Sequence, residues 1–196
     1  MSNVIDPVYF KALAERDPES LCKNALCSYD NEERSYTLSV WDEDFVVKPL
    51  ESKILKISDS EYNVDILLGL TIIYYLLYSN DFRITGEWIS EKDIPGGTTF
   101  FTGPHTIPTG LIDKKFPIIA DFNSRCERLS GKRVDMGDAA YSFKILPRVP
   151  VAIIYWKGDD EYPVQSKLLY DRSITKHLTP DIIFGMAVEV CRKFAL

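Results

Sequence analysis

Apolar and polar positions alternate along several stretches of the chain, and this spacing predicts β-strands. Residues 35–40 and 45–48 are two such stretches, and the polar residues of 41–44 between them predict a hairpin that ends at Pro49. The prolines of residues 147–150 are expected to interrupt pairing between two later strands. These further strands are expected at residues 52–57, 141–146, 151–156 and 167–170.

Helices are predicted where the apolar spacing changes or where capping residues occur. Asp6-Pro7 and Asp17-Pro18 each place a side-chain acceptor before a proline of a first helical turn, which predicts two short helices before Cys27. Residues 64–78 are apolar on almost every side, which is typical of a buried helix. The stretch is shorter than the roughly 20 residues that a membrane span requires, and it includes Asp65. It therefore predicts a buried central helix.

Two more helices follow later in the chain. Residues 113–129 predict one helix that buries Cys126 and ends at Gly131. The last helix carries the clearest signal, because Thr179 is suited to the N-cap and Pro180 to the first turn. Its apolar stripe comprises Ile182, Ile183, Met186, Ala187, Val190, Cys191 and Phe194.

Strands and helices are mixed without regular alternation, which indicates the α+β class. We expect a mostly antiparallel sheet with packed helices, one buried apolar helix and a C-terminal amphipathic helix. At 196 residues and 45% apolar content, the chain is expected to form a single domain over residues 1–196.

Charge and the cysteines narrow the range of partners. A net charge of −6 predicts that the protein binds neither nucleic acid nor an anionic membrane, since both partners require excess Lys and Arg. The first residues lack the basic and apolar runs of a secretory signal, so we expect a cytoplasmic protein. The four cysteines are expected to be reduced thiols, and Cys22 and Cys27 alone are a poor metal pair.

Residues 86–110 are rich in glycine and proline and contain His105, one of two histidines. A segment of this length and composition predicts a long irregular loop, which either binds a ligand or covers a sheet edge. His105 could act as a general base or as an axial ligand of a metal or tetrapyrrole. His177 is expected to make a local hydrogen bond or to lie in solvent.

Recognisable catalytic and cofactor motifs are missing from the sequence. The residues Ile-Pro-Gly-Gly at 94–97 lack the spacing and the following Lys-Ser/Thr of a phosphate-binding loop. Asp159, Asp160 and Glu161 follow an apolar strand and could hold a divalent cation, although the same residues are typical of a solvated turn.

Several motifs occur in order along the chain: TGEWIS at 85–90, IPGG at 94–97, GDAA at 137–140, LPRVPV at 146–151, YWKGDDEYP at 155–163 and LLYD at 168–171. Together they resemble a domain-of-unknown-function family, number 3786, of bacteria and archaea that are mostly anaerobes. Some members of this family resemble fusions with a corrinoid-type four-cysteine iron–sulfur domain. This chain has only Cys22 and Cys27 near its start, so we expect no iron–sulfur cluster.

The resemblance implies a role in anaerobic metabolism, with a link to corrinoid chemistry. Our leading hypothesis is a non-catalytic accessory protein that binds a corrinoid or other tetrapyrrole between residues 86–110 and 156–162. Trp88, Phe100, Phe101 and Trp156 would line the site, and His105 would supply an axial nitrogen. The alternatives are a metal-dependent hydrolase that uses Asp159, Asp160 and Glu161, and a subunit that binds a protein partner through exposed aromatic residues.

Overall fold

A computed structural model describes residues 5–196 and begins with two short helices. α1 (Pro7–Ala14) and α2 (Pro18–Ala25) start where the sequence predicts them. The Asp6 carboxylate accepts a hydrogen bond from the Val8 N–H at 2.9 Å, and Asp17 accepts one from Ser20 at 2.9 Å. The capping signal therefore determines both helix starts locally.

The first sheet is antiparallel and has the strand order β1-β2-β3-β4. Its strands are β1 (Ser28–Asp30), β2 (Ser35–Val40), β3 (Glu43–Lys48) and β4 (Lys53–Lys56). The predicted turn over residues 41–44 is wrong in extent, because Glu43 pairs with Val40 and only Trp41 and Asp42 turn the chain. Both turn residues have positive φ, 48° and 61°, which matches the twist of a two-residue hairpin.

The apolar stretch forms α3 (Ile66–Tyr78), with the Asp65 carboxylate accepting from Leu67 N–H at its start. This helix packs against the C-terminal helix α7 (Pro180–Ala195). The two helices approach each other at Gly185, where an added Cβ would lie at an ordinary contact distance of 3.4 Å from the Leu67 side chain. Every residue of the predicted apolar stripe of α7 is buried, which confirms the predicted face.

Residues 86–110 are not one irregular loop, as the sequence suggested, but a chain of short elements. They contain β5 (Trp88–Ile89), α4 (Gly97–Phe100) and 3-10 turns at Glu91–Asp93 and Gly103–His105. The segment is tied to the second sheet by β5, which pairs with β9 (Gln165–Asp171).

The predicted helix over residues 113–129 is also wrong, because the chain forms two helices. α5 (Gly110–Lys115) ends before Pro117, and α6 (Ile119–Arg128) begins after it. Proline has no N–H to continue the helix and disfavours helical backbone at the preceding residue. Phe116 accordingly has φ −123° and ψ 71°.

The second sheet is antiparallel and has the strand order β5-β9-β8-β7-β6. The strands not yet described are β6 (Lys132–Arg133), β7 (Ala139–Leu146) and β8 (Val149–Trp156). The expected break at residues 147–150 is shorter than predicted, because Val149 pairs with Leu146 and Pro150 with Lys144. A register shift between Lys144 and Leu146 accommodates this pairing.

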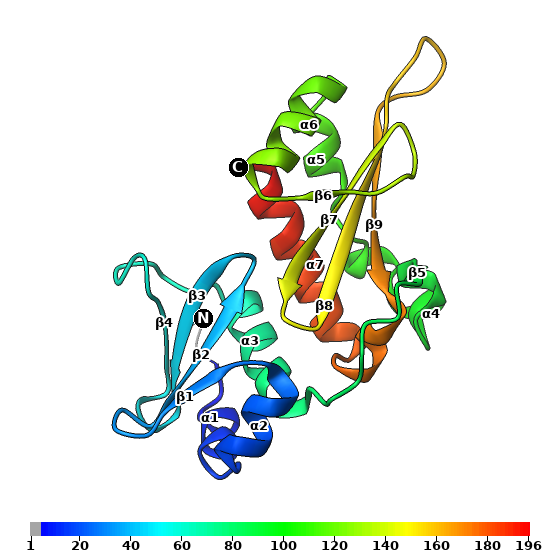
Figure 1. Ribbon diagram of the computed structural model, residues 1–196. Coiled ribbons are helices and arrows are strands. Elements are labelled where there is room, and N and C mark those ends of the chain that lie inside the picture. The colour runs from blue at the N-terminus through cyan, green and yellow to red at the C-terminus, as the bar shows by residue number, and fades with distance from the viewer. Residues whose placement is uncertain (1–4) are drawn as a thin grey trace.

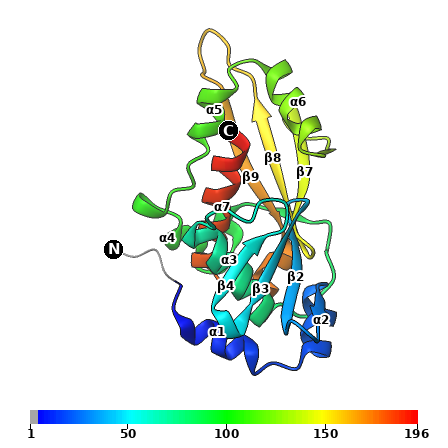
Figure 2. The same cartoon turned by 90° about the vertical axis from the view of Figure 1, so that its left-hand side faces the viewer.

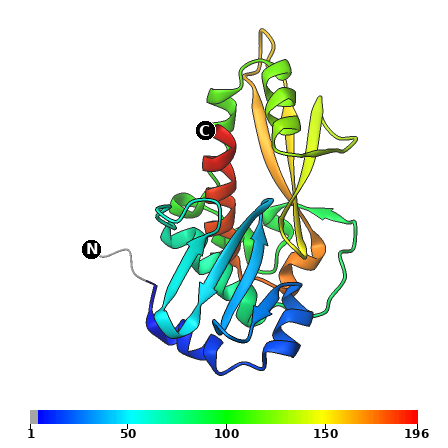
Figure 3. The same ribbon diagram turned by 60° about the vertical axis from the view of Figure 1, so that its left-hand side comes forward.

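The α+β class is confirmed, with two antiparallel sheets and packed helices. Figure 1 shows the first sheet at the lower left and the second at the upper right, with α7 beside the second sheet. Figures 2 and 3 show α3 behind the first sheet and α7 continuing along the second. We call these two halves the first and second lobes, meaning residues 5–78 and 86–196. None of the helices in residues 5–196 is long and apolar enough to cross a membrane.

Candidate functional site

A groove of about 240 Å³ lies where the two lobes meet, and we call it the interlobe groove. The hairpin of β2 and β3 forms one wall, with α3 and α7 opposite. Its apolar lining includes Val40, Phe45, Leu68, Ile145, Met186 and Val190. An apolar pocket between structural units, with a few polar groups at its rim, is the usual form of a small-molecule site.

Trp41 contacts both lobes at this groove. Its backbone N–H donates to the Ile145 carbonyl at 2.9 Å, and its ring centroid lies 5.4 Å from that of Phe143. Only 6% of the residue is exposed, and its indole Nε1 has no hydrogen-bond partner among residues 5–196. A buried donor of this kind costs free energy unless an acceptor reaches it.

Trp41 also has left-handed backbone with φ 48°, which is uncommon for a bulky residue. Such conformations cost about 1–3 kcal/mol and are found where function or packing requires them. The turn therefore holds the indole against the groove at some cost in stability.

Charged side chains form the rim of the groove. Glu43 lies between Lys56 and Lys193, with both carboxylate–ammonium distances at 2.7 Å. Partial burial by itself raises the pKa of Glu43, but the hydrogen bonds from Lys193 and Lys56 outweigh it and lower the pKa. The Lys193 ammonium also lies over the Trp41 ring, 5.2 Å from its centroid, so a cation faces the indole at the rim of the groove.

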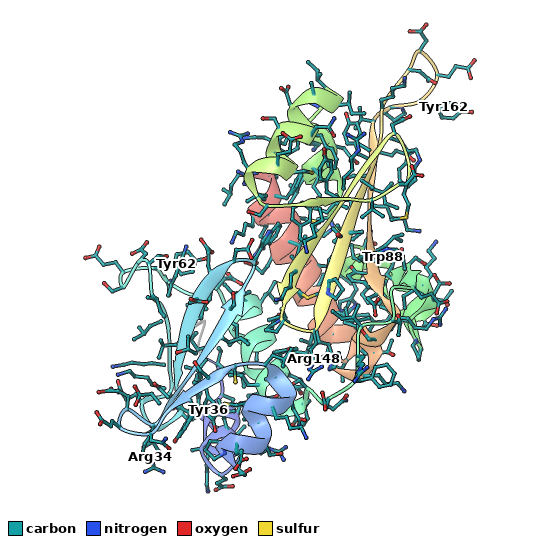
Figure 4. The ribbon with its side chains drawn as sticks, in the orientation of Figure 1. Arg34, Tyr36, Tyr62, Trp88, Arg148 and Tyr162 are labelled. Carbon is teal, nitrogen blue, oxygen red and sulfur yellow. The ribbon has the colours of Figure 1, made fainter. Side chains whose placement is uncertain are left out.

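Arg192 and Glu189 complete the rim on α7, joined at 2.8 Å. Burial raises the pKa of Glu189, and the hydrogen bond from Arg192 opposes this effect. Tyr62 lines the opposite side of the groove, and the Lys56 ammonium lies over the Tyr62 ring, 4.8 Å from the ring centroid. Figure 4 shows Tyr62 beside β4.

The site residues predicted from the sequence lie outside the interlobe groove, and they are spread over several places in the second lobe. Phe101 and Trp156 line a second groove of about 350 Å³ with Ile107 and Lys167, which we call the edge groove. The structure thus brings the 86–110 segment and the end of β8 together. Trp88 lies in β5 opposite Asp171 and is not among the residues lining this groove.

His105 and Phe100 form a stack outside both grooves. Their ring centroids are 4.5 Å apart at an interplanar angle of 16°, and Phe184 meets the imidazole edge-on at 5.2 Å. His105 is exposed and is not among the residues that line the edge groove. The expected axial ligand and the aromatic walls formed by Phe101 and Trp156 therefore lie in different places. The axial-ligand role of His105 stays a prediction.

Asp159, Asp160 and Glu161 are exposed in the turn between β8 and β9, the loop beside which Figure 4 labels Tyr162. One Asp159 carboxylate oxygen accepts from the N–H groups of Tyr162 at 2.7 Å and Glu161 at 2.9 Å. These two hydrogen bonds lower the pKa of Asp159. Residues 5–196 contain no group of three His, Cys, Asp or Glu side chains placed to hold a metal ion. The metal role stays a prediction, and the local geometry is that of an Asx-type turn.

The prediction for His177 is wrong, because its side chain neither bonds locally nor lies in solvent. The residue is 2% exposed, and both ring nitrogens lack partners within the described part of the chain. Burial, followed by the charge of Arg148, lowers the pKa of His177 to about 4.

Sequence reasoning also missed Arg148 and Trp41. Arg148 lies in the turn between β7 and β8 and reaches α2, as Figure 4 shows. The sequence does contain a signal for each residue. Arg148 lies between apolar residues and prolines, and Trp41 lies in a short turn. Neither residue type is expected at such a position unless its side chain makes long-range contacts.

Comparison with known proteins gives one match. The family described as Domain of unknown function (DUF3786) matches residues 17–193. Neither a curated protein nor a solved structure matches the chain. Since the match covers both lobes and nearly the whole sequence, the chain belongs to the DUF3786 domain family.

Proposed function

We propose that this protein is a ligand-binding protein whose interlobe groove holds a small, largely apolar molecule with an anionic acceptor group. The observation that carries this proposal is the buried, unpartnered indole N–H of Trp41 at the groove wall, within residues 5–196. Since this nitrogen has no solvent-accessible surface in the unliganded structure, an acceptor on the ligand would reach it after a small movement of the surrounding side chains, and would then recover its desolvation cost.

The size and charge of the groove restrict the ligand. A volume of about 240 Å³ lies below the roughly 300–1,000 Å³ of pockets for drug-sized molecules, so the ligand is small. Lys193 donates one hydrogen bond to Glu43 and lies over the Trp41 ring, which leaves N–H groups free to meet a negative charge there. A medium-chain carboxylate has these properties.

The test uses octanoate as the probe and the ¹⁵N-labelled indole resonances of the three tryptophans as the readout. We expect one indole N–H signal to shift saturably, and Trp41→Phe to remove that signal. Because a hydrogen bond to a charged group contributes about 1.5–3 kcal/mol, Trp41→Phe should weaken octanoate binding by about tenfold or more.

Trp156→Phe is the matched control, because Trp156 lines the edge groove. It should remove a different indole signal and leave octanoate affinity unchanged. The proposal fails if millimolar octanoate shifts no indole resonance, or if folded Trp41→Phe binds it as tightly as the parent.

A second candidate is the corrinoid or other tetrapyrrole suggested by the sequence, within anaerobic metabolism. The supporting observation is that Phe101 and Trp156 line one groove. Hydroxocobalamin and haemin titrations followed by absorption would test it. Loss of the spectral change in His105→Ala, but not in the exposed neighbour Thr99→Ala, would support an axial role for His105.

The hydrolase and partner-binding alternatives remain hypotheses with simple tests. A manganese-dependent rise in thermal stability that Asp160→Asn abolishes would support the metal site at Asp159, Asp160 and Glu161. A stable complex that is disrupted by Tyr162→Ala, at a side chain that is 65% exposed, would support an interaction surface at that turn.

A further inference from the structure

Cys22 and Cys27 bring their sulfur atoms to within 3.6 Å of each other at the end of α2. Leu26, between them, has left-handed backbone with φ 53° and ψ 48°. The N–H groups of Leu26 and Cys27 both donate to the Cys22 carbonyl, the latter at 3.3 Å. The bond from Cys27 is the six-to-one bond of a Schellman cap, and the bond from Leu26 is the five-to-one bond of an αL cap, so the turn brings the side chains of residues 22 and 27 together.

The cap explains the sulfur contact by local geometry. In a Schellman motif the third residue from the helix end and the second residue beyond it normally make a hydrophobic contact. Here both positions are cysteine, and both side chains are only partly buried. The other two cysteines, Cys126 and Cys191, are fully buried on α6 and α7.

We propose that Cys22 and Cys27 form a dithiol site that exchanges reversibly with small-molecule disulfides to give an intramolecular disulfide. In the first step a Cys thiolate attacks a disulfide R–S–S–R, forming a mixed disulfide and releasing one thiol RSH. The second Cys thiol loses its proton and attacks the mixed disulfide, which forms the Cys22–Cys27 bond and releases the second RSH. The net reaction converts one dithiol and one small disulfide into one protein disulfide and two small thiols.

Cys22 is the better first attacker. Burial raises its pKa, but the S–H of Cys27 donates to its sulfur and opposes that effect. Burial, together with the negative charge of Cys22, raises the pKa of Cys27 further. Neither thiol is activated as a thiolate, so exchange with small disulfides is expected to be slow. The proximity of the two sulfur atoms favours the intramolecular disulfide at equilibrium.

The disulfide would close a ring over residues 22–27, and this ring carries the carbonyl groups that join α2 to the rest of the molecule. Tyr75 donates its hydroxyl to the Ala25 carbonyl at 3.1 Å. Arg148 donates to the carbonyls of Asn24 at 2.7 Å and Lys23 at 3.2 Å. Oxidation thus acts on the segment through which α2 contacts the β7–β8 turn.

The experiment equilibrates the full chain with reduced and oxidised glutathione at graded ratios, quenches it with acid and maps alkylated cysteines by mass spectrometry. We expect the Cys22–Cys27 disulfide as the main oxidised species, while Cys126 and Cys191 become alkylated only after unfolding. The equilibrium constant for oxidation should be at least tenfold larger in the folded chain than in urea, because the fold holds the sulfurs together.

Two single variants serve as controls. Cys22→Ser and Cys27→Ser each keep one thiol of the pair, which should yield only a glutathione mixed disulfide. By linkage, the oxidised parent should unfold at a higher urea concentration than the reduced parent, and the variants should show no such change. The proposal is overturned if the folded parent accumulates mixed disulfide instead, or if folding does not favour oxidation.

Discussion

Replacing Arg148 with methionine should destabilise the protein strongly, because this side chain connects segments far apart in the sequence. Its guanidinium donates to the carbonyls of Asn24 at 2.7 Å, Lys23 at 3.2 Å and Phe82 at 3.3 Å. It also pairs with Asp81 at 2.6 Å. Methionine keeps the apolar stem and removes all of these donors.

The expected loss follows from these contacts. Each carbonyl left without a partner costs about 1 kcal/mol. The Asp81 pair contributes less than about 1 kcal/mol, because the Asp81 side chain is 57% exposed. Arg148→Met should therefore lower the free energy of unfolding by about 3–4 kcal/mol, which for a chain of this length lowers Tm by about 10 °C.

Urea unfolding followed by circular dichroism measures this loss, with Asp81→Ala as the matched control. That variant removes only the exposed partner and should cost less than about 1 kcal/mol. A loss below about 1 kcal/mol for Arg148→Met would refute the reasoning, since it would mean that water or other groups satisfy the carbonyls equally well.

Three further predictions concern stability. The pKa of His177 is lowered to about 4, so between pH 6.5 and 4 the unfolded chain binds a proton that the folded chain does not, and the free energy of unfolding decreases as the pH falls. After allowance for solvent screening, this effect amounts to about 2 kcal/mol. His177→Gln should remove this pH dependence from a urea–pH series. Ile183→Asp places an unpaired charge at a fully buried position of α7 and should cost several kcal/mol in urea unfolding, whereas unchanged stability would contradict the packing of α7. Gly137→Ala should cost about 2–3 kcal/mol by calorimetry, because φ is +56° and the added Cβ would lie 2.9 Å from the Tyr155 carbonyl oxygen.

Another expectation from sequence patterning is revised by the structure. The helical spacing of residues 182–194 places Glu189 and Lys193 opposite the apolar stripe, which predicts that alanine at either position costs no more than about 0.5 kcal/mol. The structure instead pairs Lys193 with Glu43 and places it over Trp41, so its removal should affect the interlobe groove.

The sequence by itself determined the features that depend on a few neighbouring residues. Asp6 and Asp17 cap their helices through bonds to N–H groups two or three residues away, so the capping pattern is sufficient to locate these two starts. Asp65 caps α3 in the same way, although the apolar pattern of residues 64–78 places it inside the predicted helix. The break at Pro117 is equally local, although the apolar spacing of residues 113–129 predicts one continuous helix across it. The apolar stripe of α7 likewise follows from helical periodicity.

Only the tertiary structure decided which residues meet across the two lobes. The burial of Arg148, His177 and the Trp41 indole depends on partners tens of residues away, and no local pattern specifies such contacts. The same holds for the separation of His105 from the groove that contains Trp156. Side-chain type indicates what chemistry a residue can perform, but burial and long-range pairing determine whether its polar atoms are satisfied, exposed or available to a ligand.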